Sequence, residues 1–287
     1  MPNPFTTLIA AAELRTLIAG SSALAIVDAS FDLADTNAGE ATWQAGHLPG
    51  AIYLHLDRDL CGPKTGADGV FKGRHPLPDR VDFASTLGRC GITPDTQVVA
   101  LDRQGGMYAA RLWWMLRWMG HEAVAVLDGG VAAWTSSGGT LTSDVNTPPA
   151  AAPYPERPAL VATIDAAQLA RRLGTVRLVD ARAGERFRGE VEPLDAAAGH
   201  IPGALNRFFK DNLGTTGQFK SRDELRAAFT PLLGGRPAGE LVHQCGSGVT
   251  ACHNLLAMDH AGLTGSVLYP GSWSEWSADS ARPIAKG

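Results

Sequence analysis

The sequence lacks the features that would place the protein in a membrane or on nucleic acid. Its formal net charge is −4 and its pI is near 6.1, so it has no basic excess to attract a phosphate backbone. Its most apolar stretch, residues 112–116, is bracketed by Arg111 and Arg117 and is far shorter than the ~18 apolar residues of a membrane span. The first residues show no basic segment followed by an apolar core, so we expect no secretory signal. We therefore predict a cytoplasmic protein with no nucleic-acid or membrane partner.

Cysteine is also scarce. The four cysteines show no paired C-x-x-C spacing; they are Cys61, Cys90, Cys245 and Cys252. A chain of 287 residues, 45% of them hydrophobic, can bury two cores without disulfide bonds, so we expect free thiols. The spacing also gives no paired motif for a metal, and we expect neither a metal nor another cofactor.

The chain contains an internal duplication. The motif Val-Asp-Ala at residues 27–29 recurs at 179–181, and Gly-His-Leu-Pro-Gly-Ala at 46–51 recurs, with Ile for Leu, at 199–204. Each copy closes with a short apolar strand, a glycine and a tryptophan, Trp134 or Trp276. A repeat of this length predicts two domains of the same architecture.

We expect an N-terminal domain at residues 1–139, a proline-rich linker at 140–158 and a C-terminal domain at 159–287. In both domains short apolar strands alternate with amphipathic helices, which predicts the α/β class, each domain a parallel sheet with helices on both faces. Sites in such sheets form beyond the carboxyl ends of strands, and Cys245 follows the apolar strand 241–244.

Cys245 is the residue best suited to covalent chemistry. The loop after it consists of Gly246, Ser247, Gly248, Val249 and Thr250, and a helix is predicted from residue 251. Glycines permit a tight turn with inward backbone N–H groups, and the positive end of the helix faces the same point. Such a loop stabilises an anion, either the Cys245 thiolate or a persulfide, whose charge lies on the outer sulfur. The alternative is a buried cysteine that only fills space.

Together, the duplicated motifs and a cysteine loop confined to the second copy resemble the tandem rhodanese-type sulfurtransferases, over residues 8–283. The run Cys-Gly-Ser-Gly-Val-Thr-Ala at 245–251 is similar to that of the 3-mercaptopyruvate sulfurtransferase branch. Thiosulfate-preferring members place basic residues at the positions of Gly246 and Ser247. Thiosulfate is a compact dianion that benefits from such cations, whereas the carboxylate of mercaptopyruvate can be bound by an arginine and neutral donors.

The resemblance implies that Arg186 binds the substrate, with Arg188 as a second candidate and Gly246, Gly248, Val249 and Thr250 contributing through the loop. Both arginines could instead be solvated loop charges. The branch usually carries another arginine after a nearby Glu-Pro, but here Leu194 and Asp195 follow.

The resemblance also implies a proton relay of Ser247, His75 and Asp57, in which a histidine suits proton transfer near neutral pH. The alternative is a turn histidine and a surface aspartate. In the first copy Asp102 stands where Cys245 stands in the second and cannot form a persulfide, so we expect that copy to be catalytically silent. His47 and His200 recur in both copies, which indicates a structural role.

We expect a monomeric sulfurtransferase acting on small molecules. Cys245 takes sulfur from 3-mercaptopyruvate, and the persulfide passes it to a thiophilic acceptor; the resemblance implies cyanide, thiols or thioredoxin. The alternatives are a thiosulfate:cyanide sulfurtransferase (rhodanese) and, more remotely, a non-enzymatic sulfur-carrier domain, against which Arg186 argues. A phosphatase on the same fold would need an arginine where Ala251 stands.

Overall fold

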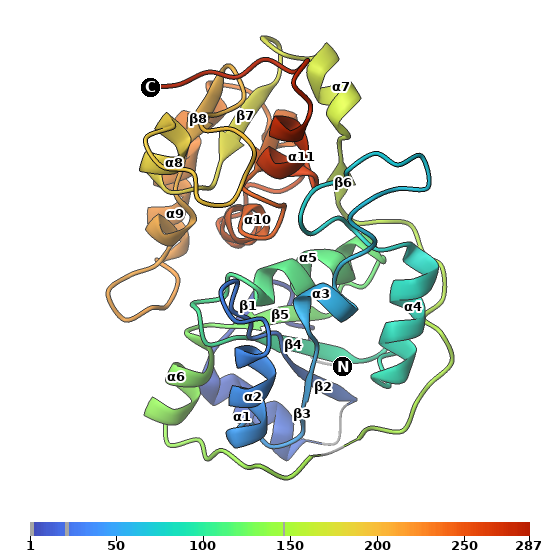
Figure 1. Ribbon diagram of the computed structural model, residues 1–287. Coiled ribbons are helices and arrows are strands. Elements are labelled where there is room, and N and C mark those ends of the chain that lie inside the picture. Colours follow the sequence, from blue (N-terminus) through green and yellow to red (C-terminus); the bar gives the residue numbers. More distant parts are fainter. Residues whose placement is uncertain (1–2, 21–22, 146) are drawn as a thin grey trace. The chain divides into compact units, whose positions relative to one another are not determined.

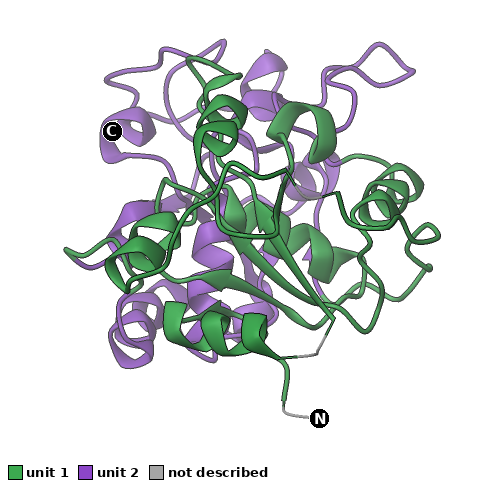
Figure 2. Cartoon of the chain, turned by 90° about the horizontal axis from the view of Figure 1, so that it is seen from below, with its two compact units in different colours: residues 1–61, 78–160, 215–219 green, residues 62–77, 161–214, 220–287 purple. Residues whose placement is uncertain are grey.

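The structure, a computed structural model, describes residues 3–20, 23–145 and 147–287. Residues 1, 2, 21 and 22 of the expected first domain and residue 146 of the expected linker lie outside the described residues. The chain forms two compact units, coloured separately in Figure 2. The first unit contains Met1–Cys61, Pro78–Leu160 and Thr215–Phe219. The second contains Gly62–Leu77, Val161–Gly214 and Lys220–Gly287.

The first unit is built on a five-stranded parallel sheet of order β1-β5-β4-β2-β3 (Figure 1). Its inner strands are rich in valine and alanine and almost entirely buried, as in sheets covered on both faces. The strands are β1 (Leu8–Ile9), β2 (Leu24–Asp28), β3 (Ala51–Tyr53), β4 (Gln97–Leu101) and β5 (Val124–Leu127). The helices are α1 (Ala11–Ala19), α2 (Ala38–Ala45), α3 (Leu56–Asp59), α4 (Arg80–Arg89), α5 (Ala109–Trp118) and α6 (Gly130–Ser136).

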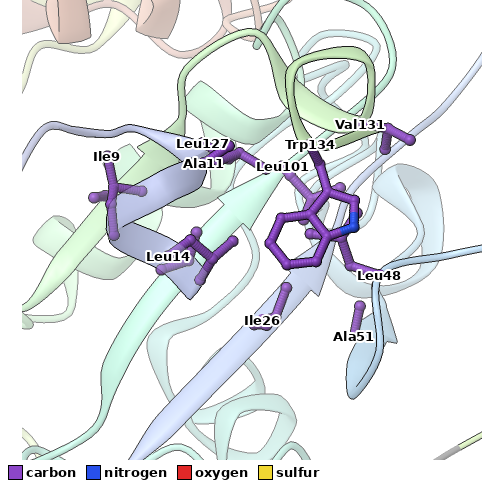
Figure 3. Close-up of a cluster of buried hydrophobic side chains, with 12 residues drawn as sticks. Ile9, Ala11, Leu14, Ile26, Leu48, Ala51, Leu101, Leu127, Val131 and Trp134 are labelled. Atoms are coloured by element: carbon purple, nitrogen blue, oxygen red, sulfur yellow. The ribbon is translucent and has the colours of Figure 1, made fainter. Parts of the chain in front are cut away.

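Successive side chains of β4 point to opposite faces of this sheet. Val99 and Leu101 join a buried cluster with residues of α1 and α6, in which the Trp134 indole lies among aliphatic side chains (Figure 3). On the other face the strand packs against α5, whose residues 109–116 are all buried. The sheet therefore has helices on both faces.

The second unit repeats this plan with the order β6-β10-β9-β7-β8, again all parallel. Its strands are β6 (Ala162–Thr163), β7 (Arg177–Asp180), β8 (Ala204–Asn206), β9 (Leu241–Gln244) and β10 (Val267–Leu268). Its helices are α7 (Ala166–Arg171), α8 (Gly184–Arg188), α9 (Arg222–Leu233), α10 (Ala251–His260) and α11 (Ser272–Ala278), with 3-10 helices η1 (Phe209–Asn212) and η2 (Ala238–Glu240). Residues of α7 and α11 share a cluster with Val242 of β9, while α9 and α10 pack against β7 and β9. The predicted α/β class, with two parallel sheets covered on both faces, is confirmed.

His47 and His200 hold equivalent turns in the two copies. Each ring is buried, hydrogen-bonds a carbonyl oxygen through Nδ1 at 2.8 Å, and stacks on an aromatic ring, that of Trp43 or Phe187. Each residue also forms an antiparallel bridge, His47 to Thr142 and His200 to Ala285. These contacts are structural, as the recurrence of both histidines predicts.

The described part of residues 140–158 contains neither helix nor strand. The chain here runs along α4: Ala151 donates to the Gly88 carbonyl at 2.8 Å, and Tyr154 donates to that of Ala84 at 3.0 Å. A side chain at Gly88 would lie 2.7 Å from the Ala152 carbonyl oxygen, so glycine permits this close approach. Within the described ranges, no helix combines the length and the apolar character needed to cross a bilayer.

Candidate active site

Cys245 lies directly after β9, at the carboxyl end of a central strand. All four cysteines are free thiols, and Cys245 is almost completely buried, with 1% of its surface exposed. Its backbone is held from both sides: its carbonyl accepts from Trp273 N–H at 3.0 Å, and its own N–H donates to Ser272 Oγ at 3.1 Å. The nucleophile predicted from the sequence therefore has a fixed backbone at the strand end where sites of parallel sheets form.

The loop after Cys245 is buried from Gly246 to Val249, and Thr250 is half-buried immediately before α10. Gly248 has φ +77°, a left-handed conformation that favours glycine, and a side chain there would collide with the Pro270 carbonyl. The Cys252 thiol donates to the Gly248 carbonyl at 3.3 Å and joins the loop to α10. The loop therefore leads directly into the positive end of a ten-residue helix.

The equivalent loop of the first copy shows what this geometry can hold. The Asp102 carboxylate accepts four backbone N–H groups at 2.8–2.9 Å, from Gln104, Gly106, Tyr108 and Ala109. Inward-pointing amides that begin a helix thus surround an anion in this copy. The first-copy loop is filled by its own carboxylate.

Ser272 has an unusual backbone. Among the described residues it is the non-glycine residue with positive φ, at 53°, and it is fully buried. The corresponding residue of the first copy is Gly130, with φ 56°. Ser272 Oγ accepts from Cys245 N–H and donates to the Tyr269 carbonyl at 2.9 Å, and these bonds offset the strain. Ser272 is not among the site residues predicted from the sequence. The first copy has Gly129-Gly130 where the second has Gly271-Ser272, and this difference could have indicated it.

The segment Gly62–Leu77 belongs to the second unit, although it precedes most of the first in the sequence. It places the buried His75 against the loop, with Nδ1 at 2.7 Å from Ser247 Oγ. Two members of the predicted relay are therefore in hydrogen-bonding contact. The third, Asp57, lies in α3 of the first unit, where its N–H donates to His55 Nδ1 at 3.1 Å, and its part in a relay stays a prediction.

The two predicted arginines have different surroundings. Arg188 is exposed and pairs with Glu190 at 2.7 Å, which fits a solvated ion pair. Arg186 is largely covered, and its Nη2 donates to Glu192 at 2.6 Å and to Asp195 at 3.1 Å. A Cβ built on Gly246 would lie 3.5 Å from Arg186 Nη1, so this guanidinium borders the loop.

Arg74 also borders the loop, although it is not among the site residues predicted from the sequence. Its Nη1 contacts Asp195, while its Nη2 would lie 2.8 Å from a Cβ at Gly246. Burial raises the pKa of Asp195 above its ordinary value, and the Arg74 guanidinium acts in the opposite direction. Arg74 thus places a second guanidinium beside the Cys245 loop. The chain has Leu194 at the position where the family resemblance implies an arginine.

The model of the rhodanese-like domain matches this chain twice, over residues 10–137 and 165–279. A probable 3-mercaptopyruvate sulfurtransferase of Pseudomonas aeruginosa is 47% identical over 267 residues, 92% of this chain and 93% of that protein. A putative thiosulfate sulfurtransferase of Mycobacterium tuberculosis is 39% identical over 284 residues, 98% of this chain and 97% of that protein. The solved structure of the 3-mercaptopyruvate sulfurtransferase of Leishmania major superposes with a TM-score of 0.84 at 29% identity, covering 99% of this chain and 77% of that one.

Proposed function

This chain belongs to the rhodanese-like domain family, and on that premise we propose that it is a sulfurtransferase that uses 3-mercaptopyruvate as its sulfur donor. The observation that carries the proposal is the buried Cys245 at the end of β9, followed by a neutral loop in contact with His75 and bordered by Arg186. Neutral residues at positions 246 and 247 suit a donor with one carboxylate better than a compact dianion.

In the first half-reaction the Cys245 thiolate attacks the sulfur of the donor. A sulfur–sulfur bond forms, the carbon–sulfur bond breaks, and its electron pair passes to carbon as the enolate of pyruvate. The proton of the donor's thiol leaves, and a proton is delivered to the enolate carbon. The hydrogen-bonded pair of His75 and Ser247 beside the loop is suited to this transfer, and we assign the relay to it, with Asp57 as the predicted third member.

In the second half-reaction a nucleophilic acceptor attacks the outer sulfur of the persulfide, and the Cys245 thiolate leaves. We propose cyanide, small thiols or thioredoxin as acceptors, with the protein acting as a monomer in the cytoplasm. The loop of the first copy carries no sulfur, because Asp102 stands in place of a cysteine and its carboxylate fills the loop.

The test is to mix the protein with 3-mercaptopyruvate, measure pyruvate, and determine by mass spectrometry which cysteine gains a sulfur atom. We expect Cys245→Ser to abolish both signals. Cys90→Ser is the matched control, because burial raises the pKa of Cys90 to about 11 and keeps that thiol protonated. Pyruvate formation that survives in Cys245→Ser would refute the persulfide mechanism.

The second candidate function is a thiosulfate sulfurtransferase, which the name of the M. tuberculosis relative favours. The two functions are distinguished by measuring kcat/KM for 3-mercaptopyruvate and for thiosulfate, with cyanide as acceptor. A preference for 3-mercaptopyruvate of more than about tenfold, or ~1.4 kcal/mol in the barrier, supports the first assignment. A preference for thiosulfate would replace it with the second.

A further inference from the structure

The second unit contains a cavity of about 260 Å³. Among the described residues that line it, none is assigned above to sulfur transfer. Its volume is just below the range of about 300–1,000 Å³ that holds drug-sized ligands, so it suits a smaller molecule. Apolar side chains form much of its wall; they belong to Pro63, Pro76, Leu77 and Ile164. The cavity can therefore cover the apolar part of a small ligand.

The carboxylates of Asp165 and Glu275 line the same cavity. Asp165 is the N-cap of α7, and its Oδ1 accepts from Gln168 N–H at 2.7 Å. Glu275 lies in α11 and accepts from the Tyr269 hydroxyl at 2.8 Å; within the described ranges this is the one hydrogen bond of its carboxylate. Burial raises the pKa of Glu275, and the nearby Asp165 carboxylate acts in the same direction. The cavity wall thus brings two negative charges close together near neutral pH.

The neighbouring cations are paired with other carboxylates. Lys72, in the cavity wall, contacts Asp68 at 3.1 Å, and Arg282 contacts Asp279 at 3.4 Å. Both cations act to lower the pKa of Glu275, but in the part of the chain that the structure describes neither forms an ion pair with it. Arg282 instead donates to the main-chain carbonyl of Glu275 at 2.7 Å. The half-buried carboxylate of Glu275 therefore has no cation of the described chain in direct contact.

We propose that this cavity binds the ammonium group of a small aliphatic amine. An ammonium group donates three hydrogen bonds, and the wall offers three acceptors: the carboxylates of Asp165 and Glu275 and the oxygen of Tyr269, which keeps its lone pairs when its hydroxyl donates. The alkyl part of the amine then lies against the prolines and aliphatic side chains of the wall. Binding here does not depend on which sulfur donor the protein uses.

The turn at Pro270 and Gly271 belongs both to the cavity wall and to the support of the Cys245 loop. A side chain at Gly248 would collide with the Pro270 carbonyl, and Ser272, the next residue after the turn, accepts from Cys245 N–H at 3.1 Å. The cavity thus adjoins the support of the loop, while the thiol of Cys245 is no part of its wall. Amine binding should therefore be the same in Cys245→Ser as in the unmodified protein.

The experiment measures the binding of hexylammonium, 1-hexanol and hexanoate to the full chain by titration calorimetry near neutral pH. The three probes share one alkyl chain and differ in charge. We expect hexylammonium to bind at least about 10-fold more tightly than 1-hexanol, because a charge-assisted hydrogen bond is added, and hexanoate not to bind. Glu275→Gln and Asp165→Asn should each weaken hexylammonium about 10-fold and leave 1-hexanol unchanged. Asparagine at position 165 keeps the helix cap, so this variant decides the question if Glu275→Gln fails to fold.

The matched control is Glu240→Gln, which removes the same charge from an exposed glutamate of the same unit. An equal loss of hexylammonium binding in this variant would show only a general effect of net charge and would overturn the proposal. Equal affinity for hexylammonium and 1-hexanol would also overturn it, and so would loss of binding in Cys245→Ser. Nα-acetyl-lysine amide carries the same ammonium group on a peptide unit. It should bind no better than hexylammonium, and tighter binding would refute the assignment to a small amine.

Discussion

The strain at Ser272 gives a prediction about stability that can be separated from activity. Its φ of 53° costs a residue with a Cβ about 1–2 kcal/mol, which glycine avoids. Its hydroxyl makes two buried hydrogen bonds, one of them to the Cys245 N–H. We compare Ser272→Ala, which loses both bonds and keeps the strain, with Ser272→Gly, which loses both bonds and relieves it.

We expect Ser272→Ala to lower the free energy of unfolding by about 2–4 kcal/mol, because two hydrogen bonds disappear and the buried Cys245 N–H is left unsatisfied. Ser272→Gly should lose about 0.5–1 kcal/mol less, since relief of the strain exceeds the larger entropy of an unfolded glycine. Both variants remove the same support from Cys245 and should show the same loss of kcat/KM with 3-mercaptopyruvate.

Urea unfolding measures the difference, and Ser277 provides the control. Ser277 lies in the same helix and is buried, but its φ is not positive. In an ordinary helical position glycine is about 1 kcal/mol less favourable than alanine, so the order of the two variants should be reversed at Ser277. A Ser272→Gly protein no more stable than Ser272→Ala would show that the strain argument is wrong.

Three further predictions follow from individual contacts. Ser247→Ala should slow persulfide formation in single-turnover measurements by about 100- to 10,000-fold, because the hydroxyl in contact with His75 is lost. An unchanged rate would exclude the pair from proton transfer. Asp102→Asn places an amide group among backbone N–H donors, and we expect it to lower the free energy of unfolding in urea by about 2–4 kcal/mol. The folded variant should keep its activity; a loss of activity would contradict the prediction that the first copy is catalytically silent. Burial raises the pKa of Glu275 above 4.5, so the folded state binds the proton more tightly and stability falls as pH rises from 4.5 through the raised pKa. Glu275→Gln should therefore be more stable than the parent in urea at neutral pH and lose that advantage below pH 4.5; an equal advantage at both pH values would refute this.

The sequence alone determined the repeated architecture and indicated Cys245 as the candidate nucleophile. Short apolar strands that alternate with helices along the chain predicted parallel sheets. The duplicated motifs predicted two copies of the same architecture, and the two sheets have equivalent strand orders. Cys245 was identifiable because its strand, its glycines and its helix are contiguous in the chain. The same comparison of the copies predicted that Asp102 replaces it in the first.

The tertiary structure decided which residues surround Cys245. The segment Gly62–Leu77 has no periodicity that predicts where it packs, yet it belongs to the second unit and places Arg74 beside Gly246 and His75 beside Ser247. The left-handed backbone of Ser272 has no local signal, because serine rarely adopts positive φ; the indication in the sequence is the glycine at the equivalent position of the first copy, Gly130. The physical reason is that strands and helices are determined by residues close together in the sequence. The charged and polar groups around a site instead meet through contacts between distant residues, such as Arg74 and Asp195, and only the packed chain specifies these contacts.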